Sequence, residues 1–166
     1  MVDGGGKWVY RAGQWGSKGG PVEGLVVMFV GTFEHSLDDK GRVVLPSTFR
    51  AQLADRGFLA QWDRCLGLWT EEGFSDAAER LTQRIRNGEV PQGALRAFAA
   101  NAHEVRPDSQ GRITIPQRLR DFAGLGRDAV VIGAIDRIEI WQTGRWTDQT
   151  ELADDSLIQA VTALGL

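Results

Sequence analysis

The sequence predicts a β-rich α+β fold in which two copies of one small unit pack about an internal pseudo-twofold axis. Three observations predict it. A segment at residues 38–50 recurs at residues 108–120. Short runs rich in β-branched residues follow an Asp-x-x-Gly turn in both copies, as is typical of strands. Helical segments separate the two copies and follow the second one.

The repeat is the strongest pattern in the chain. Its first copy reads Asp-Asp-Lys-Gly-Arg-Val-Val-Leu-Pro-Ser-Thr-Phe-Arg, and its second reads Asp-Ser-Gln-Gly-Arg-Ile-Thr-Ile-Pro-Gln-Arg-Leu-Arg. The first Asp, the Gly, the Arg after it, the Pro and the final Arg are identical, and the apolar positions match in kind. Upstream, Glu34 aligns with Glu104. Because such self-similarity at a fixed spacing indicates duplication, we interpret the chain as a tandem repeat.

Residues 1–27 differ from the rest, because they include seven glycines in the first 20 positions and show no strand or helix period. We expect a disordered segment or a mis-annotated N-terminal extension, with translation starting at Met28 in the second case. Tryptophan is encoded only by TGG, and Trp8 and Trp15 both precede a residue whose codon begins with G. The underlying DNA therefore reads TGGG twice, seven codons apart, which is close to two helical turns of about 10.5 base pairs each. We interpret this segment as translated upstream control DNA, and the alternative is a coincidence within a short GC-rich segment.

The first unit is placed at residues 28–87. Its expected elements, in order, are a strand at 28–33, a strand at 42–45, a short helix at 47–53, a hairpin of 58–61 with 65–70, and a helix at about 75–87. Ser75 is expected to cap this last helix, and Gly88 is expected to lie just past its end.

The remaining segments follow the same pattern. A connecting helix is placed at 88–100, the second unit at 101–150, and a helical tail at 151–166. The expected elements here are a helix at 92–100, a strand at 112–115, a helix at 117–122, a hairpin of 129–134 with 137–142, and helical residues from 145 to 164. A strand-turn-strand unit of this size cannot bury its apolar face alone, so the two units are expected to pack together.

The turn of each unit has its own chemistry. Its glycine is free to adopt a positive φ, and its aspartate can accept hydrogen bonds from nearby backbone. The proline ends the following strand, because it lacks an N–H donor, and suits the first turn of a helix. The residues with an expected structural role in the turns are Asp38, Gly41, Pro46, Asp108, Gly111 and Pro116.

Composition narrows the cellular setting and the partners. No apolar run approaches the roughly 20 residues that span a bilayer, no secretory signal is visible, and the single Cys65 cannot form an internal disulfide. We therefore expect a cytoplasmic protein without a membrane partner. The net charge is −3, with 19 basic and 22 acidic residues. A nucleic-acid binder of this composition must concentrate positive charge on one face, or do so by assembling several subunits.

Motifs for catalysis are missing from the sequence. The two histidines, His35 and His103, are not in a metal-ligand spacing. No nucleophile elbow, phosphate-binding loop or dinucleotide fingerprint occurs either. We expect a protein that is not an enzyme and that uses neither a metal nor a cofactor.

The repeated Asp-x-x-Gly-Arg-φ-x-φ-Pro segments, in which φ is an apolar residue, resemble the signature of the MraZ family. That family shares the swapped-hairpin β-barrel of AbrB-like DNA-binding proteins, so the resemblance implies two tandem swapped-hairpin β-barrel repeats with short helices. It runs from Met28 to about Gln149 and leaves residues 1–27 outside. Further matching segments are 28–32, 131–133 and 138–141. The second copy departs from the first by having Ser109-Gln110 in place of Asp39-Lys40, which makes it less basic.

This resemblance implies a cytoplasmic, nucleoid-associated transcriptional regulator that controls its own operon of cell-division and cell-wall genes. Members of the family form ring homo-oligomers and bind closely spaced, G-rich direct repeats containing TGGG upstream of their own gene. The DNA-contacting arginines of the family fall on Arg42 and Arg112.

The residue types suit this role. A guanidinium group can bond the O6 and N7 atoms of guanine together, so arginines suit a G-rich site, whereas a lysine suits a phosphate contact. The alternative for the two turn arginines is an internal ion pair with Asp38 or Asp108 that braces the turn. The candidate DNA-binding residues are Arg42, Arg112, Lys40, Arg50, Arg120 and Arg118.

A different class of function stays open from the sequence. A protein-interaction or antitoxin-like module could use the same barrel to bind a partner protein through the aromatic residues that follow each second hairpin. Loss of DNA binding in Arg42→Ala with an intact oligomer would favour the regulator, and an unchanged affinity would favour the interaction module.

Overall fold

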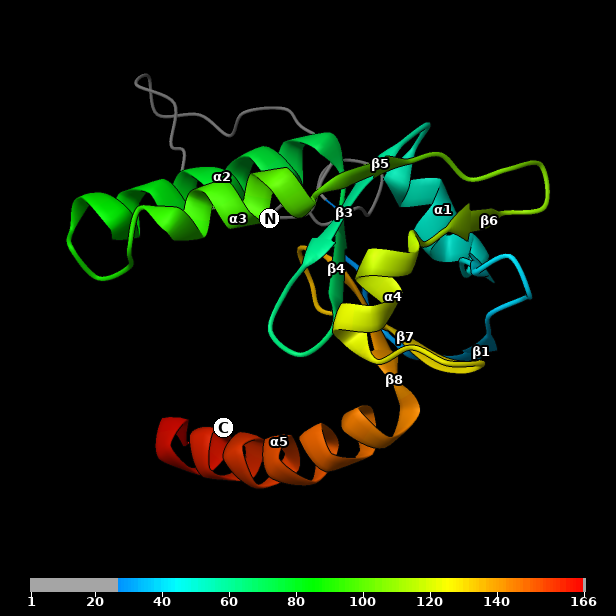
Figure 1. The fold of residues 1–166 in the computed structure, drawn as a ribbon. Coiled ribbons are helices and arrows are strands. Elements are labelled where there is room, and N and C mark those ends of the chain that lie inside the picture. The colour runs from blue at the N-terminus through cyan, green and yellow to red at the C-terminus, as the bar shows by residue number, and fades with distance from the viewer. Residues whose placement is uncertain (1–26, 166) are drawn as a thin grey trace, which may run out of the picture.

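The computed structural model describes residues 27–165. The expectation of a disordered or mis-annotated segment therefore lies outside the described residues, apart from Val27. The elements follow one another in the order β1 (Thr32–Ser36), β2 (Arg42–Val44), α1 (Ser47–Leu53), β3 (Gly57–Gln61), β4 (Leu66–Trp69), α2 (Glu71–Arg86), α3 (Gly93–Asn101), β5 (His103–Val105), β6 (Arg112–Thr114), α4 (Gln117–Ala123), β7 (Asp128–Gly133), β8 (Ile138–Gln142) and α5 (Thr143–Leu164) (Figure 1).

The strands form two separate antiparallel sheets. One has six strands in the order β1-β7-β8-β4-β3-β5, and the other, which we call the ribbon, consists of β2 and β6. The sequence predicted two tandem β-barrel repeats, and this prediction is wrong in one respect, because the described strands do not close into a barrel. The strands of the ribbon are three residues long and pair with each other, so within residues 27–165 no strand joins the edge strands β1 and β5.

Strands of the two copies pair with one another as well as within each copy, where β3 pairs with β4 and β7 pairs with β8. β1 of the first copy pairs with β7 of the second, and β5 of the second pairs with β3 of the first. β2 pairs with its counterpart β6, and β4 with its counterpart β8. When β5–β8 are matched with β1–β4, the order of the large sheet reads the same from either edge. This is the arrangement expected of two units related by a pseudo-twofold axis through the centre of the ribbon.

The main core lies between the ribbon, the large sheet and the helices α1 and α4. Val43 and Ile113 at the centre of the ribbon are each 1% exposed and belong to one buried cluster with apolar side chains of the sheet. Phe29 and Phe49 meet edge to face in this cluster, with ring centroids 5.5 Å apart. Side-chain packing, rather than backbone hydrogen bonding, thus holds the ribbon on the sheet.

Two local expectations need correction. The strand expected at 28–33 begins only at Thr32, because Gly31 has a φ of 104° and interrupts the extended backbone after the single bridge of Phe29 to Ile135. Ser75 does not cap α2, which already begins at Glu71. Thr70 is the cap, and its side chain accepts a hydrogen bond of 3.0 Å from the N–H of Gly73.

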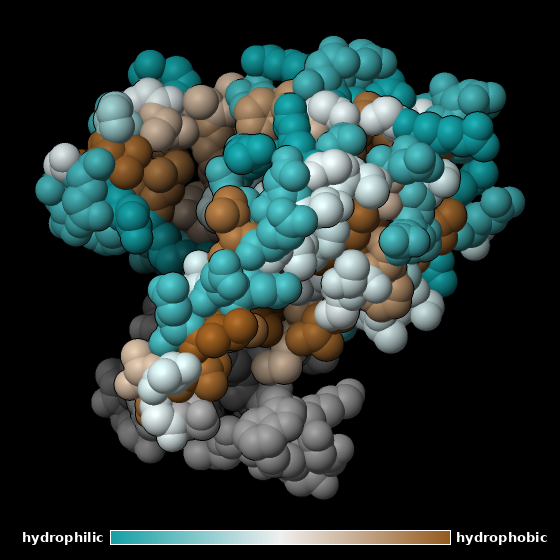
Figure 2. Space-filling model, turned by 90° about the horizontal axis from the view of Figure 1, so that it is seen from below, coloured by the Kyte–Doolittle hydropathy of each residue, from teal (hydrophilic) through white to brown (hydrophobic). Residues whose placement is uncertain are grey.

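The helices outside the core differ in how much of their surface packs against the rest of the chain. α2 packs against α3 through a second buried cluster that includes Trp69 and Phe98. α5 leaves the body after β8 and projects along one side of the molecule (Figure 1). Its residues from 151 to 165 are exposed, and apolar side chains are visible in the view from below, the side on which α5 lies (Figure 2). None of the described helices has the length and apolar content needed to cross a membrane.

Candidate nucleic-acid interface

The ribbon brings the two motif arginines to one surface. Its register places Arg42 opposite Thr114 and Val44 opposite Arg112. Side chains alternate between the two faces of a strand, and the buried pair Val43 and Ile113 occupies the inner face. The other four residues therefore share the outer face of the ribbon, namely Arg42, Val44, Arg112 and Thr114.

Asp38 organises the turn before β2. Its Oδ1 accepts hydrogen bonds from the backbone N–H of Lys40 at 3.0 Å and of Arg42 at 2.9 Å, and its Oδ2 pairs with Nε of Arg42 at 2.7 Å. The backbone N–H of Gly41 closes the turn onto the carbonyl of Asp38. The hydrogen bond from the backbone of Arg42 is the largest of the effects that hold the pKa of the Asp38 carboxyl below its ordinary value. The aspartate is therefore ionised over the whole neutral range.

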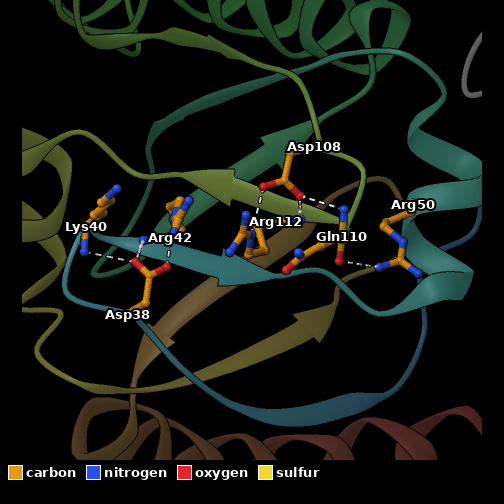
Figure 3. A network of polar contacts seen from close by, with 7 residues as sticks. All are labelled: Asp38, Lys40, Arg42, Arg50, Asp108, Gln110 and Arg112. Atoms are coloured by element: carbon orange, nitrogen blue, oxygen red, sulfur yellow. Dashed lines mark hydrogen bonds and ion pairs between the residues drawn. The ribbon is translucent and has the colours of Figure 1, made fainter.

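The second copy repeats this geometry. Asp108 accepts from the backbone N–H groups of Gln110 and Arg112, both at 2.9 Å, and pairs with Nε of Arg112 at 2.7 Å (Figure 3). Its pKa is lowered by the same causes, with the backbone hydrogen bond from Arg112 first. The replacement of Lys40 by Gln110 thus leaves the turn unchanged and removes one positive charge.

Each ion pair occupies one end of its guanidinium group. Within residues 27–165, Arg42 and Arg112 bond their aspartates through Nε, and their terminal Nη groups carry no further hydrogen bond or ion pair. The two side chains are 27% and 26% exposed. The aspartate fixes the direction of the side chain while donors remain at its outer end. An internal ion pair and a contact with an outside acceptor are therefore compatible at these residues.

Each turn is also held by the other copy. The carbonyl of Gly111 accepts a hydrogen bond of 2.9 Å from Leu45, and the carbonyl of Gly41 accepts one of 2.9 Å from Ile115. Gly41 and Gly111 have φ values of 72° and 77°, which side-chain-bearing residues rarely adopt. The two turns are thereby fixed relative to each other as well as internally.

The remaining candidate arginines have different surroundings. Arg50 reaches across to the second turn, where its Nη1 lies 3.4 Å from the carbonyl of Gln110 and its guanidinium covers Gly111. Arg120 covers Gly41 in the same way and donates from Nη2 to Gln117 at 2.6 Å. Arg118 is exposed on α4. Figure 3 shows Lys40, Arg42, Arg112 and Arg50 in one band along the ribbon.

Sequence reasoning missed two features of this surface. It did not place Arg50 and Arg120 over the glycines of the opposite turns, because that contact depends on the exchange of strands. It also overlooked Val44 and Thr114 on the outer face. The alternation of side chains along a strand could have identified these two, since each lies two residues after a motif arginine.

Other reactive groups lie away from the ribbon. Burial lowers the pKa of His35 and raises that of the Cys65 thiol. Among residues 27–165, no group of three or more His, Cys, Asp or Glu side chains is arranged to hold a metal ion. Of the aromatic residues considered for protein binding, Trp69 and Trp141 are 0% and 3% exposed, so they pack within the chain.

The chain matches a model of the family described as "MraZ protein, putative antitoxin-like" over residues 28–90 and 98–165, which cover the two copies of the repeat. Relatives named transcriptional regulator MraZ agree with it over most of their length. The one from Salinispora arenicola is 41% identical over 129 residues, which are 77% of this chain and 91% of that protein. The one from Kocuria rhizophila is 42% identical over 120 residues, 72% of this chain and 84% of that protein. The one from Acetivibrio thermocellus is 36% identical over 143 residues, 84% of this chain and 100% of that protein.

Proposed function

This chain belongs to the MraZ family of bacterial DNA-binding transcriptional regulators, and from this premise we propose that the outer face of the ribbon reads DNA sequence through Arg42 and Arg112. The observation that carries the proposal is the geometry of these arginines. Each is held at Nε by an ionised aspartate and keeps its terminal donors free. Two donors on a fixed planar group suit the O6 and N7 acceptors of guanine in the major groove.

The proposed site is a set of G-rich direct repeats of the TGGG type upstream of the protein's own gene, in an operon of division and cell-wall genes. The codons of Trp8 and Trp15 support it, because the DNA that encodes them contains two such boxes about two helical turns apart. This observation concerns the DNA and is independent of the structure of residues 1–27. The proposed location is the cytoplasm, in association with the nucleoid.

The other basic residues have supporting roles in this proposal. Lys40 and Arg118 are exposed and contact phosphates, which position the protein without specifying sequence. Arg50 and Arg120 hold the two turns and add positive charge beside them. The strand exchange supports a swapped-hairpin topology, although the sheets are not closed into a barrel.

Assembly compensates for the low positive charge of one chain. A chain of net charge −3 that offers a few cations to DNA binds weakly and in a salt-sensitive way. A ring homo-oligomer presents the same face many times along a repeated operator and raises the effective concentration without new contacts. Exposed apolar side chains on α5, such as Leu157 and Leu164, are available for contacts between copies.

Fluorescence anisotropy with a labelled fragment carrying the TGGG repeats tests this function. We expect Arg42→Ala and Arg112→Ala each to weaken binding by about tenfold, in line with about 1–3 kcal/mol for a bidentate contact to guanine. Arg84→Ala is the matched control, because Arg84 is an exposed arginine on α2, outside the ribbon. Its affinity should equal that of the wild type.

Two readouts complete the design. Light scattering reports whether each variant keeps the assembly of the wild type, and a scrambled-repeat competitor reports specificity. Equal, salt-sensitive binding of wild type and the arginine variants to both DNAs would refute sequence readout by the ribbon. The alternative function, recognition of a partner protein in an antitoxin-like manner, would then take its place.

A further inference from the structure

The outer face of the ribbon carries two residues with no role so far. Val44 is an apolar side chain that is 38% exposed, and Thr114 is exposed at the equivalent position of the second copy. They differ in polarity, but both carry a γ-methyl group on a branched Cβ. We propose that these methyl groups contact the 5-methyl group of thymine, so that the ribbon reads T as well as G. This inference rests on the proposed function and adds a second base to it.

The register of the ribbon places each methyl group beside an arginine of the other copy. Thr114 lies directly opposite Arg42, and Val44 lies directly opposite Arg112. Directly opposed residues of an antiparallel pair have Cβ atoms about 4.5–5.5 Å apart. Successive bases of one DNA strand rise by about 3.4 Å. An arginine and the methyl group opposite it are therefore spaced to meet neighbouring bases.

The chemistry of the major groove matches this pair. Guanine presents O6 and N7 acceptors there, and thymine presents a methyl group that takes apolar contacts from side chains such as threonine. A two-stranded ribbon is one of the elements that the major groove admits. Each pair of arginine and methyl group, drawn from both copies, thus suits a step from T to G. The TGGG boxes that contain the codons of Trp8 and Trp15 include this step.

The pairs also explain how two motif copies of different charge can both take part in binding DNA. The second copy lacks the lysine of the first turn, but the methyl group of its Thr114 stands beside the arginine of the first copy. The two pairs are related by the pseudo-twofold axis, so they face opposite strands of the DNA, and the thymine of one TGGG box lies on the strand that one of the pairs faces. Variants at one position therefore report on one pair.

Replacement of thymine by uracil in the TGGG boxes tests the inference, because uracil lacks only the 5-methyl group. We expect the wild-type protein to bind the thymine DNA about fourfold more tightly for each methyl contact, the effect of burying one such group. The double variant Val44→Ser/Thr114→Ser removes the γ-methyl groups from an exposed face. Its affinity ratio for the two DNAs should be close to one.

A matched control keeps both methyl groups in exchanged positions. The double variant Val44→Thr/Thr114→Val should retain the wild-type ratio and the wild-type dependence of affinity on salt. Thermal unfolding of all proteins, followed by circular dichroism, shows that the ribbon is folded.

The outcomes separate this inference from the function on which it rests. A wild-type ratio of one, with TGGG still preferred over scrambled DNA, would overturn the thymine contact and leave the guanine readout intact. A ratio that survives in the double serine variant would overturn it too, because the methyl contact would then come from elsewhere. Loss of the preference for TGGG in the wild type would overturn the proposed function itself.

Discussion

At the scale of single residues, Arg42 and Arg112 divide their donors between the protein and the outside. In both copies the aspartate, itself bonded to the backbone, pairs with Nε of the arginine at 2.7 Å. This ion pair orients the arginine side chain and restricts its conformational freedom. Such preorganisation lowers the entropy that a flexible arginine would lose on binding. In the function proposed above, the aspartates contribute to recognition by orienting the arginines.

Low pH should remove the stability that Asp38 and Asp108 contribute to the fold. The folded state lowers the pKa of Asp38 and Asp108, so the unfolded state takes up protons first as the pH falls. Their contribution to stability is complete above the ordinary carboxyl pKa of 3.8 and is lost as the pH falls through the lower folded value. Urea unfolding of the wild type and of Asp38→Asn/Asp108→Asn, measured between pH 7 and pH 2.5, checks this. The free energies of unfolding of the two proteins should converge at low pH. A difference that stays constant with pH would contradict the link between the lowered pKa values and stability.

The glycine of each turn is required by its backbone conformation. Gly41→Ala introduces a Cβ at a φ of 72° and displaces the guanidinium of Arg120. We expect a loss of about 1–2 kcal/mol in the free energy of unfolding. Gly93→Ala is the control, because Gly93 lies in α3 with nothing within 4 Å of an added Cβ. If both substitutions changed the urea midpoint equally, the strain argument would fail.

The element scale shows what the sequence could predict. The short helices and both second hairpins lie where turn and proline signals place them, and α1 has the expected residues 47–53. Local signals failed where two of them competed, because Thr70 and Ser75 are both good N-caps and only Thr70 bonds the helix backbone. The edge strand β5 was not anticipated, since three residues give too short a pattern.

The start of α2 provides a direct comparison of the two capping candidates. Thr70→Ala removes the acceptor of the hydrogen bond from Gly73 and should cost about 1 kcal/mol of stability. Ser75→Ala, inside α2, should be neutral or slightly stabilising because alanine favours helix. Thermal unfolding of both variants decides between them. A larger loss in Ser75→Ala would show that α2 begins where the sequence first suggested.

The residues of the candidate site were predictable from the sequence, but the strand pairing that brings them together was not. The motif identifies Arg42 and Arg112 because they repeat, yet a repeat does not reveal which face of a strand points outward or which strands pair. The crossing of Arg50 to the second turn follows from pairing between copies. Contacts between distant parts of a chain leave no local signal, so the sequence could not predict this one.

At the scale of the whole molecule, neither copy has a complete sheet of its own. β2 pairs with β6, and β1 pairs with β7, so a fragment of residues 27–90 lacks the partners of both strands. We expect this fragment to be unfolded when dilute and to fold as a dimer when concentrated, in which a second fragment supplies the missing strands. Circular dichroism and light scattering across a concentration series measure this. A folded monomeric fragment would contradict the dependence of each copy on the other.

The exchange of strands also sets the order of events during synthesis. Thr32 pairs with Ile132, so strand β1 can pair only after a partner that is made a hundred residues later. A protein of such high contact order folds slowly, because a long loop must close before its contacts form. While the ribosome completes the second half, the first half exposes unpaired edges that match those of other nascent chains. Neighbouring ribosomes on one messenger therefore bring together first halves whose unpaired edges match, which favours misfolding between copies.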